Sequence, residues 1–595
     1  MKVLTDLFEP ATDHELISWL FIKSLALVYA AAFMSLAVQI DGLAGPDGIL
    51  PLQRLLDGAF AELGYRALLR LPTLFWLNSS SAALQGAAYA GAIAALLLTL
   101  GWVRPRPALI ALFVLYLSLV HAGQIFMSFQ WDTLLLESGF LAIFLVDAPT
   151  RLIVLLFDWL LFRLRFLSGY FKLASGDPSW RDFTALNYYF ETQPLPHVGS
   201  WYAHQSPDWV LKAGVGFTLF AELIVPMFIF LPRPFRLFAA ATTVLAQLMI
   251  IATSNHNFIN LLTILLCLFL LDDRIVAFLL PGSVRDRIRG QAARAVPGPR
   301  AKGLAGAVAL LILVLSSTTM IASQARRPLP RALTVLNEIP PAFGIGNVFH
   351  LFPTMQTERQ ELKIFGSTDG RTWQAYAFRY KPDAPDRAPQ FIVPHQPRLD
   401  WMMWFLPPQW PDTDFWRRSW SRCGRTGRRS RACWRTIRSK ANRRRTGCGC
   451  WPIDTASRRR WSGPAPATGG RPSIWASIRT CPRGAHDGLS TGDGAPFGFR
   501  FNPARPLVTF MTGCSTLFRE NSDGTKANRS DRSGAGRNSG VRRRRRAVRV
   551  RRARNFVDDF VAHCARDHDL QRRPGAGARR PACDARARTA NSRIS

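Results

Sequence analysis

Cysteine is almost absent from the first 416 residues of this chain, where Cys267 is the only one. A lone thiol inside an apolar run behaves as a small hydrophobic side chain, and it cannot perform disulfide exchange by itself. The sequence also lacks an HExxH pair, a glycine-rich phosphate loop, a nucleophile elbow and a dinucleotide-binding fingerprint. His121, His256 and His395 are not spaced as metal ligands. We therefore expect no metal and no cofactor.

Acidic residues are scarce at one end of the chain. Of the 75 Lys+Arg and 40 Asp+Glu, 43 basic but only 11 acidic residues follow Trp416, which leaves 32 and 29 before it. The run Arg542–Arg546 is typical of a nucleic-acid or anionic-lipid patch, and the eight cysteines of this tail suggest metal ligands. However, no paired CxxC knuckles occur, and few apolar runs could bury a core. We expect no nucleic-acid partner and no zinc site.

Translation of a GC-rich gene in the wrong frame explains this tail better. Codons can be chosen for Arg435–Arg444 that read HNPFQGEPP from the third base, and the same shift turns Pro472–Pro482 into EYLGEYPHVP. Both strings are ordinary protein sequence. We predict that residues 417–595 are an out-of-frame, disordered tail without function.

Long apolar runs dominate the sequence before Trp416. About 20 helical residues cross a bilayer core. The candidate spans are Leu20–Val38, Ala82–Leu100, Leu109–Ala122, Thr133–Val146, Leu152–Phe171, Trp209–Phe230, Phe235–Thr253, Phe258–Leu271 and Leu304–Ile321. The third, fourth and eighth are short, and the fifth carries Asp158, Arg163 and Arg165, which suggests that it lies partly at the interface. The sequence predicts an α-helical polytopic membrane protein with about nine spans in residues 1–322.

The positions of the arginine residues predict how these spans are oriented in the membrane. Arginine gathers in the loops before Leu109, before Phe235 and before Leu304. Basic residues accumulate in short cytoplasmic loops, and nine crossings place all three loops on one side. The amino terminus is then cytoplasmic, and everything after Ile321 lies outside.

Two outer regions follow from this orientation. The first is the loop Leu173–Asp208, which is rich in Pro, Trp and Tyr. The second, residues 323–416, is predicted to be a small β-rich external domain, truncated where the frame changes. Its strand-like stretches are Glu361–Gly366 and Arg371–Tyr380, and the Asp-Gly pair between them is a strong hairpin signal.

Charged residues inside predicted spans are candidates for function because their burial in lipid is costly. Asp132 and Glu137 are five residues apart, roughly 140° around a helix, so they do not share a face. Glu222 lies in the middle of the sixth span, where Lys172 could pair with it; a snorkelling Lys172 is the alternative. His256 is interpreted as part of a polar turn between the seventh and eighth spans.

Several strings, in order from about Asp13 to Trp404, resemble the lipase maturation factor family. They include FQWDTLLLESGF from Phe129, YFETQPLP from Tyr189 and PHQPRLDW from Pro394. The family-motif and candidate client-binding residues are Gln130, Trp131, Asp132, Glu137, Lys172, Asp177, Trp180, Glu191, Gln193, Trp201, Glu222, Trp373, His395, Gln396, Arg398, Asp400 and Trp401.

This resemblance implies a multi-span membrane protein that helps secreted lipases fold and assemble, without a reaction or a cofactor. Its animal relatives reside in the endoplasmic reticulum membrane, with a client-binding domain on the lumenal side. The GC-rich style of this chain indicates a prokaryotic member, in the inner membrane with a periplasmic external domain. The expected partners are membrane lipid and an exported client protein such as a lipase.

The aromatic residues of the two outer regions are candidates for client contact. They are Trp180, Trp201, Tyr202, Trp373 and Trp401. Exposed aromatic surface could bind unfolded clients. The alternative is that they form an interfacial belt or a β-core.

A second resemblance points to an enzyme. The stretch Leu167–Leu173, followed by Trp180, is similar to a signature of the vitamin K-dependent carboxylase-like membrane family, which implies Lys172 as a base with Glu222 or Asp132. The Asn-His motif of that family is replaced here by Gln-Trp-Asp. A transporter is a third class, but it would require broken helices in matching halves, which the sequence lacks.

Overall fold

The computed structural model describes residues 6–146, 149–292, 298–324, 330–359, 364–367, 374–382, 387–405, 437–438 and 449–450. All of them fall in the first of the two units into which the chain divides, Met1–Glu520.

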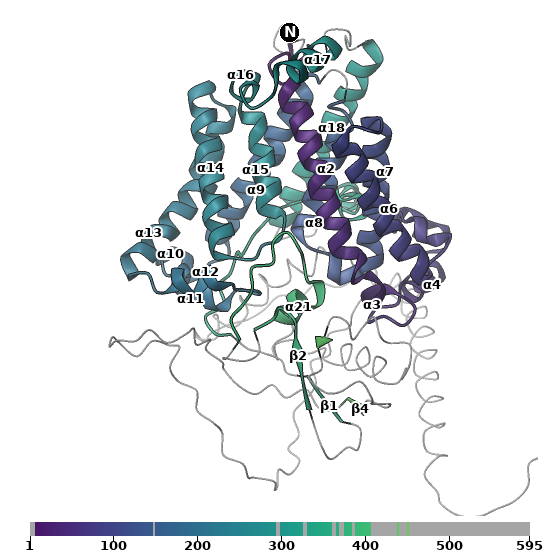
Figure 1. Cartoon of the computed structure of the whole chain (residues 1–595), viewed down its shortest axis with the longest axis vertical. Coiled ribbons are helices and arrows are strands. Elements are labelled where there is room, and N and C mark those ends of the chain that lie inside the picture. Colours follow the sequence, from purple (N-terminus) through teal and green to yellow (C-terminus); the bar gives the residue numbers. More distant parts are fainter. Residues whose placement is uncertain are drawn as a thin grey trace, which may run out of the picture. The chain divides into compact units, whose positions relative to one another are not determined.

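A bundle of helices forms the main body of the described chain (Figure 1). The long helices are α2 (Glu15–Ala37), α6 (Ser81–Leu100), α7 (Pro105–Gly123), α9 (Arg151–Ala174), α14 (Arg233–Thr253) and α18 (Pro299–Gln324). The shorter ones are α8 (Gln130–Ala142), α13 (Asp208–Leu219) and α15 (Ile259–Leu266). Two 3₁₀ turns extend the bundle helices: η3 (Gln124–Met127) follows α7, and η6 (Cys267–Leu270) follows α15.

Six segments are long and apolar enough to cross a membrane: Glu15–Ala37, Ser81–Leu100, Pro105–Met127, Asp208–Phe230, Arg233–Thr253 and Pro299–Gln324. They correspond to the first, second, third, sixth, seventh and ninth predicted spans. The third was predicted to be short, which is wrong. Pro105 begins α7 four residues before the predicted run, because proline at the first helical position loses only an N–H that has no partner there.

The other predicted spans differ from these six. α8 and α15 are short, as predicted. α9 has 24 residues, and its charges Asp158, Arg163 and Arg165 are buried. The prediction that these charges mark an interfacial helix is therefore wrong, because they face the interior of the bundle.

The sixth span is not a continuous α-helix. After α13 the chain forms a π-helical turn, η4 (Phe220–Ile224), and then a 3₁₀ segment, η5 (Val225–Phe230). Pro226 has no N–H to donate, so the regular α-helical ladder cannot pass through it. This break places Glu222 in the π-helical turn.

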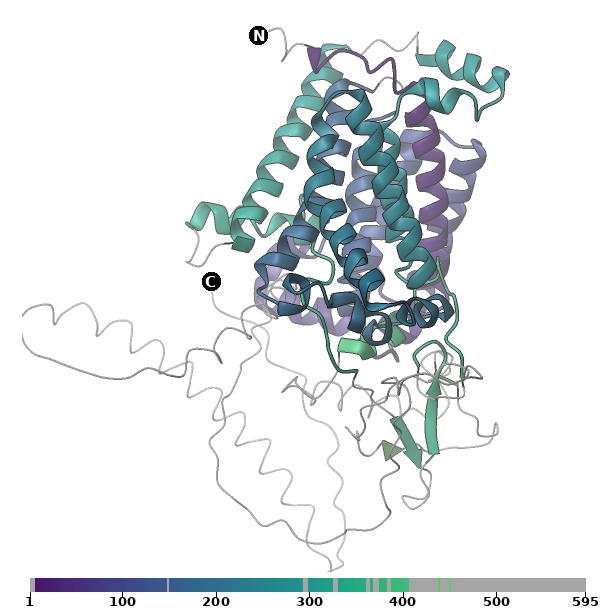
Figure 2. The same cartoon turned by 90° about the vertical axis from the view of Figure 1, so that its left-hand side faces the viewer.

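One end of the bundle holds the amino terminus together with α16 (Asp273–Ala277) and α17 (Gly282–Ala292) (Figures 1 and 2). The Asp273 carboxylate accepts hydrogen bonds from the backbone N–H groups of Glu15 and Leu16, both at 3.0 Å, and so caps the start of α2. Arg233 contacts Asp272 at 2.5 Å. The start of α14, with Arg233, and the stretch Asp272–Asp273 therefore lie at the same end as the start of α2.

Short helices cover the opposite end (Figure 1). The predicted loop Leu173–Asp208 forms α10 (Pro178–Arg181), α11 (Ala185–Thr192) and α12 (Val198–His204). Between α2 and α6 lie α3 (Ile40–Ala44), α4 (Leu52–Leu63), η1 (Gly64–Arg66), α5 (Ala67–Arg70) and η2 (Leu74–Trp76).

The chain after α18 begins with helices where the sequence predicted β-structure. These are α19 (Arg331–Leu336) and α20 (Ile339–Phe343), which start after Pro330 and Glu338. Further on, β1 (Ile364–Ser367) and β2 (Gln374–Phe378) pair antiparallel, with Ile364 opposite Tyr376. Part of each predicted strand-like stretch thus forms a strand, and the Asp-Gly turn between them lies outside the described residues. Extended chain then leads to α21 (Arg398–Met402) and η7 (Met403–Phe405).

Two very short strands extend this hairpin. β3 (Ile437–Arg438) pairs with β2, and β4 (Gly449–Cys450) pairs with β1. An open strand edge presents unpaired N–H and C=O groups to any extended segment. These four residues are the part of 417–595 that the structure describes, so the predicted disorder of the tail stays a prediction.

Candidate functional site: a returning segment over buried charges

The chain that follows α20 folds back over the end of the bundle. We call residues 344–359 and 387–405 the returning segment. Its contacts with the bundle involve most of the residues that the sequence singled out, and they centre on three buried charged clusters.

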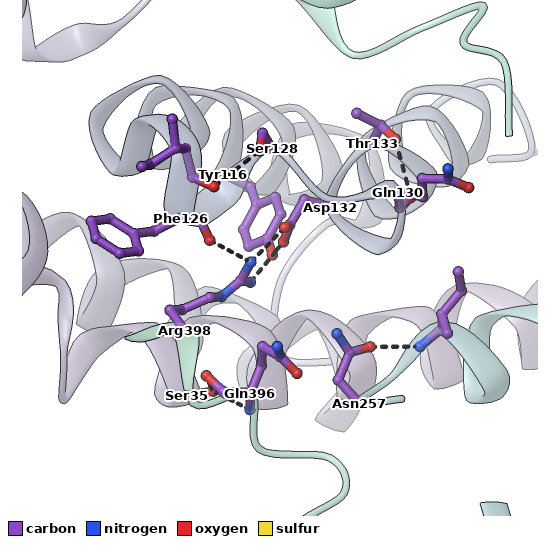
Figure 3. Close-up of polar contacts among 12 residues, drawn as sticks. Ser35, Tyr116, Phe126, Ser128, Gln130, Asp132, Thr133, Asn257, Gln396 and Arg398 are labelled. Atoms are coloured by element: carbon purple, nitrogen blue, oxygen red, sulfur yellow. Dashed lines mark hydrogen bonds and ion pairs between the residues drawn. The ribbon is translucent and has the colours of Figure 1, made fainter. Parts of the chain in front are cut away.

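The first cluster joins α8 to α21 (Figure 3). Arg398 donates from Nη1 to Asp132 Oδ2 at 2.5 Å and from Nη2 to Asp132 Oδ1 at 2.7 Å. The Tyr116 hydroxyl donates to the same Oδ1 at 2.6 Å, and Arg398 also reaches the Phe126 carbonyl at 3.1 Å. Both charged side chains are fully buried. A bidentate pair of this kind constrains the relative orientation of the guanidinium and the carboxylate and also balances their charges.

Ser35 of α2 and Gln39, which immediately precedes α3, hold the backbone that leads into Arg398. The Gln39 side chain accepts from the Arg398 backbone N–H at 3.0 Å and donates to the Gln396 carbonyl at 2.7 Å. Ser35 Oγ accepts from the Gln396 N–H at 2.9 Å and lies 2.9 Å from His395 Nδ1. These buried bonds fix the register of the returning segment along α2.

The second cluster joins α8 to α9. Glu137 and Arg163 form a fully buried ion pair. The returning segment completes it, since the Gly346 N–H donates to Glu137 Oε2 at 3.0 Å and Arg163 donates to the Asn347 carbonyl at 2.8 Å. The prediction that Asp132 and Glu137 occupy different faces of α8 is confirmed, because they bind separate arginines.

The third cluster contains Lys172. Its ammonium lies 2.8 Å from Glu222 Oε2, so the predicted pairing is confirmed. Lys172 also donates to the Leu351 carbonyl at 2.7 Å and lies 5.0 Å from the Trp180 ring centroid. Arg165 lies 3.6 Å from the second oxygen of Glu222.

A glycine allows this third cluster to form. A Cβ placed on Gly169 of α9 would lie 2.8 Å from the Cβ of Glu222. Only glycine therefore lets α9 approach the π-helical turn closely enough for Lys172 to reach Glu222.

Further family residues hold the same segment through its backbone. Gln130 accepts from the His350 N–H at 2.8 Å and donates to the His350 carbonyl. Asp177 caps α10 and accepts from the Met355 N–H at 2.5 Å. Arg359 donates to the carbonyls of Glu191 and Gln193.

Burial shifts the pKa of three groups in the returning segment. Burial lowers the pKa of His350 and of His395 to about 4. It raises the pKa of Asp400 to about 6, although the backbone N–H groups of Tyr380 and Lys381 partly offset the shift. The docked segment therefore favours neutral histidines.

The predicted aromatic contacts separate into buried and exposed ones. Trp180 and Trp401 are buried, and the Trp401 ring lies edge-on to Trp131 with centroids 5.0 Å apart. The expectation that these two present a client surface is therefore wrong for this conformation. Trp201 is half-buried, Tyr202 is 64% exposed, and Trp373 lies outside the described residues.

Sequence reasoning missed several partners in the clusters. They are Ser35, Gln39, Tyr116, Arg163, Gly346 and Asn347. Arg163 had a signal, a cation in an apolar run, but it was read as interfacial. The others carried no signal, because single polar residues in helices and loops are common.

His256 lies in the non-helical stretch between α14 and α15, as predicted. Its ring nitrogen lies 2.5 Å from the Tyr189 hydroxyl. In the described part of the chain, no group of three or more His, Cys, Asp or Glu residues could hold a metal ion.

The apolar helices and their inward-facing charges define an integral multi-pass membrane protein. The lipase maturation factor transmembrane domain matches residues 16–278, and the lipase maturation factor C-terminal domain matches residues 345–421. This chain belongs to the lipase maturation factor family. Asp132 lies in the first matched range and Arg398 in the second, so the buried pair joins the two domains.

Several curated relatives are similar over most of their length. Lipase maturation factor 2 of Xenopus laevis is 32% identical, over 66% of this chain and 71% of the relative. Lipase maturation factor 1 of Bos taurus is 34% identical, over 64% of this chain and 74% of the relative. Lipase maturation factor 2 of Homo sapiens is 33% identical, over 65% of this chain and 71% of the relative. No solved structure matches this chain.

Proposed function

We propose that this protein is a membrane-embedded maturation factor that helps exported client proteins, lipases among them, to fold or assemble. The supporting observation is the clamp between the two family domains. Three buried ionic clusters fix the start of the C-terminal domain to the bundle. A client bound to that domain is held at a defined distance from the membrane in which the protein is embedded.

Exposed apolar side chains at the end of the bundle covered by the returning segment offer a contact surface for a client. Tyr202 of α12 and Trp209 of α13 are exposed, the latter by 72%, and Phe391 of the returning segment is also exposed. The rings of His197 and Phe391 are 5.5 Å apart, so the returning segment and α12 contribute to one region. Exposed apolar surface of this kind suits an unfolded or unassembled chain. We assign the client contact to these residues instead of the buried tryptophans.

The test is secretion of a lipase precursor from cells that lack their own maturation factor. The full chain should raise secreted lipase activity and co-purify with the precursor. Tyr202→Ser with Phe391→Ser should reduce both, because the contact loses apolar area. Phe278→Ser, at the end of the bundle where α2 starts, is the control, since Phe278 is also a large exposed aromatic side chain. Lipase activity no higher than in cells without the protein would overturn the lipase proposal.

A membrane enzyme using Lys172 is the second candidate, and the burial of this lysine beside Glu222 favours it. However, the Lys172 ammonium has three acceptors, Glu222 at 2.8 Å and the carbonyls of Leu351 and Ser168 at 2.7 and 3.5 Å. An ammonium has three donors, so all are used. We therefore propose that Lys172 holds the returning segment and that the protein is not an enzyme.

A further inference from the structure

An apolar surface outside the bundle helices lies on the stretch from α4 to η2. Leu77 is 89% exposed, Tyr65 81% and Leu69 71%, and Phe60, Leu68 and Leu74 are also exposed. We call these six side chains the α4–η2 patch. So many neighbouring apolar groups on one surface indicate a partner that covers them.

Two hydrogen bonds fix the depth of this patch along the bundle. The Leu74 N–H donates to Ser118 Oγ at 3.0 Å, and the Thr73 hydroxyl donates to the Ser118 carbonyl at 3.3 Å. Ser118 lies five residues before the end of α7, and at 1.5 Å per residue it is about 7 Å inside that end. The turn η2 therefore lies beside an apolar span and about 7 Å inside the end of α7.

The patch is continuous with a surface that faces lipid. Leu77 is four residues before the start of α6, and the outward side of α6 presents Tyr89, Ile93, Leu96 and Leu100. The span containing these residues is long and apolar enough to cross the membrane. Lipid acyl chains that cover this face of α6 would therefore also contact the α4–η2 patch.

The polar side of α4 fits the same arrangement. Arg54, Asp57 and Glu62 are exposed on α4, whereas Leu52 and Leu56 are buried against the protein. The apolar side of α4 therefore packs on the protein, and its charged side faces outward, where it can reach the lipid headgroups.

We propose that residues 52–77 are an interfacial element inserted into the outer leaflet, with lipid acyl chains as the partner that covers the α4–η2 patch. The element also supports the outer domain. Arg70 forms a 2.7 Å ion pair with Glu338, between α19 and α20. Lipid contact on one side thereby positions the start of the chain that leads into the returning segment.

Nitroxide accessibility in lipid vesicles tests this proposal. In a full chain whose nine cysteines are replaced by serine, single cysteines at Leu69 and Leu77 carry a spin label. Ile93 on the lipid face of α6 is the lipid reference, and Glu62 on the polar side of α4 is the water reference. These four side chains are exposed, so labelling removes little packing, and the thermal unfolding midpoint reports whether each variant folds.

Labels at Leu69 and Leu77 should resemble the label at Ile93. Oxygen, which concentrates in lipid, should relax them efficiently, and a water-soluble nickel chelate should reach them several-fold less than it reaches Glu62. Equal access of the chelate at Leu77 and Glu62 would overturn the proposal. Shielding from both probes would also overturn it, because protein and not lipid would then cover the patch. Neither readout involves a client, so the result is independent of the proposed function.

Discussion

Asp132 of α8 and Arg398 of α21 are 266 residues apart in the sequence and share two hydrogen bonds of 2.5 and 2.7 Å. No water-exposed charge takes part, because both side chains are fully buried. The pair joins the transmembrane domain to the C-terminal domain, so its loss should affect both.

Replacing one partner of this pair should be strongly destabilising. In Asp132→Ala the Arg398 guanidinium stays buried without its carboxylate, which typically costs about 3–5 kcal/mol. The thermal unfolding midpoint in lipid nanodiscs should fall, and protease should cleave the returning segment faster. The exposed pair Lys212 and Asp208 gives the control, since Lys212→Ala should change stability by less than about 1 kcal/mol. An unchanged midpoint in Asp132→Ala would show that the pair does not hold the two domains together.

Gly346 should not tolerate a side chain. Its φ of +70° lies in the left-handed region, and an added Cβ would stand 2.7 Å from the Leu315 Cβ. We expect Gly346→Ala to lower the free energy of unfolding by on the order of 2 kcal/mol or more. Gly303 of α18, which has open space around it, is the matched control. Its replacement by alanine should be neutral or slightly stabilising because alanine favours helix.

Variants of Lys172 separate a structural role from a catalytic one. Lys172→Met leaves the buried Glu222 without its closest cation, so stability should fall by about 3–5 kcal/mol. Adding Glu222→Leu should recover only part of the loss, because the buried Arg165 then loses its carboxylate. Lys172→Arg keeps a cation in place. It should retain most lipase secretion if the residue holds the returning segment. A folded Lys172→Arg protein without function would favour the lysine-base enzyme.

Acidification should loosen the returning segment. In the released chain His350 and His395 regain ordinary pKa values near 6.5, whereas the docked rings titrate near 4. Released histidines therefore bind protons that docked ones do not, and docking weakens as pH falls from 6.5 towards 4. Asp400 acts in the opposite direction, since its pKa rises from 3.8 to about 6 on docking, but one carboxyl opposes two imidazoles. Relative to the intrinsic exchange rate, which itself falls as pH falls, hydrogen exchange of residues 392–402 should quicken over this range.

The histidines are the testable origin of that pH dependence. His350→Asn with His395→Asn should remove most of the acceleration and leave the small opposite effect of Asp400. If exchange in the double variant depends on pH as strongly as in the unchanged protein, other groups control docking.

The nucleotide sequence tests the shifted frame. The C-terminal family match ends at residue 421, close to the predicted frame change after Trp416. Resequencing the DNA around these codons should reveal a one- or two-base insertion or deletion. Correcting it should give a continuation that contains the strings HNPFQGEPP and EYLGEYPHVP. An uninterrupted frame confirmed by independent reads would contradict this interpretation.

Composition alone predicted the helices that face lipid, because bilayer thickness sets both their length and their apolar character. The sequence left the pairing of Lys172 with Glu222 and a snorkelling Lys172 as alternatives, and the structure shows the pairing. α7 was underestimated because Arg104, Arg106 and two prolines hide the start of the helix from a count of apolar residues. Hydropathy says little about where a proline-led helix begins.

The partners of Asp132 and Glu137 could not be predicted in the same way. Arg398 and Gly346 follow the last span, in a stretch whose composition indicates an extended outer domain. Nothing local in PHQPRLDW shows that its arginine enters the bundle, nor that Trp401 is buried instead of exposed. Those facts depend on how the chain returns after α18, which is a property of the tertiary fold.

The clusters also set an order for biosynthesis. Asp132 is synthesised long before the ribosome reaches codon 398, so α8 must wait with an uncompensated carboxylate until Arg398 has been made. An insertion intermediate that stalls in this interval carries a feature that quality-control proteases and membrane chaperones detect, namely a lone charge within lipid. Premature stop codons before Arg398 should consequently lead to rapid degradation of the whole bundle, even though every span has already been made.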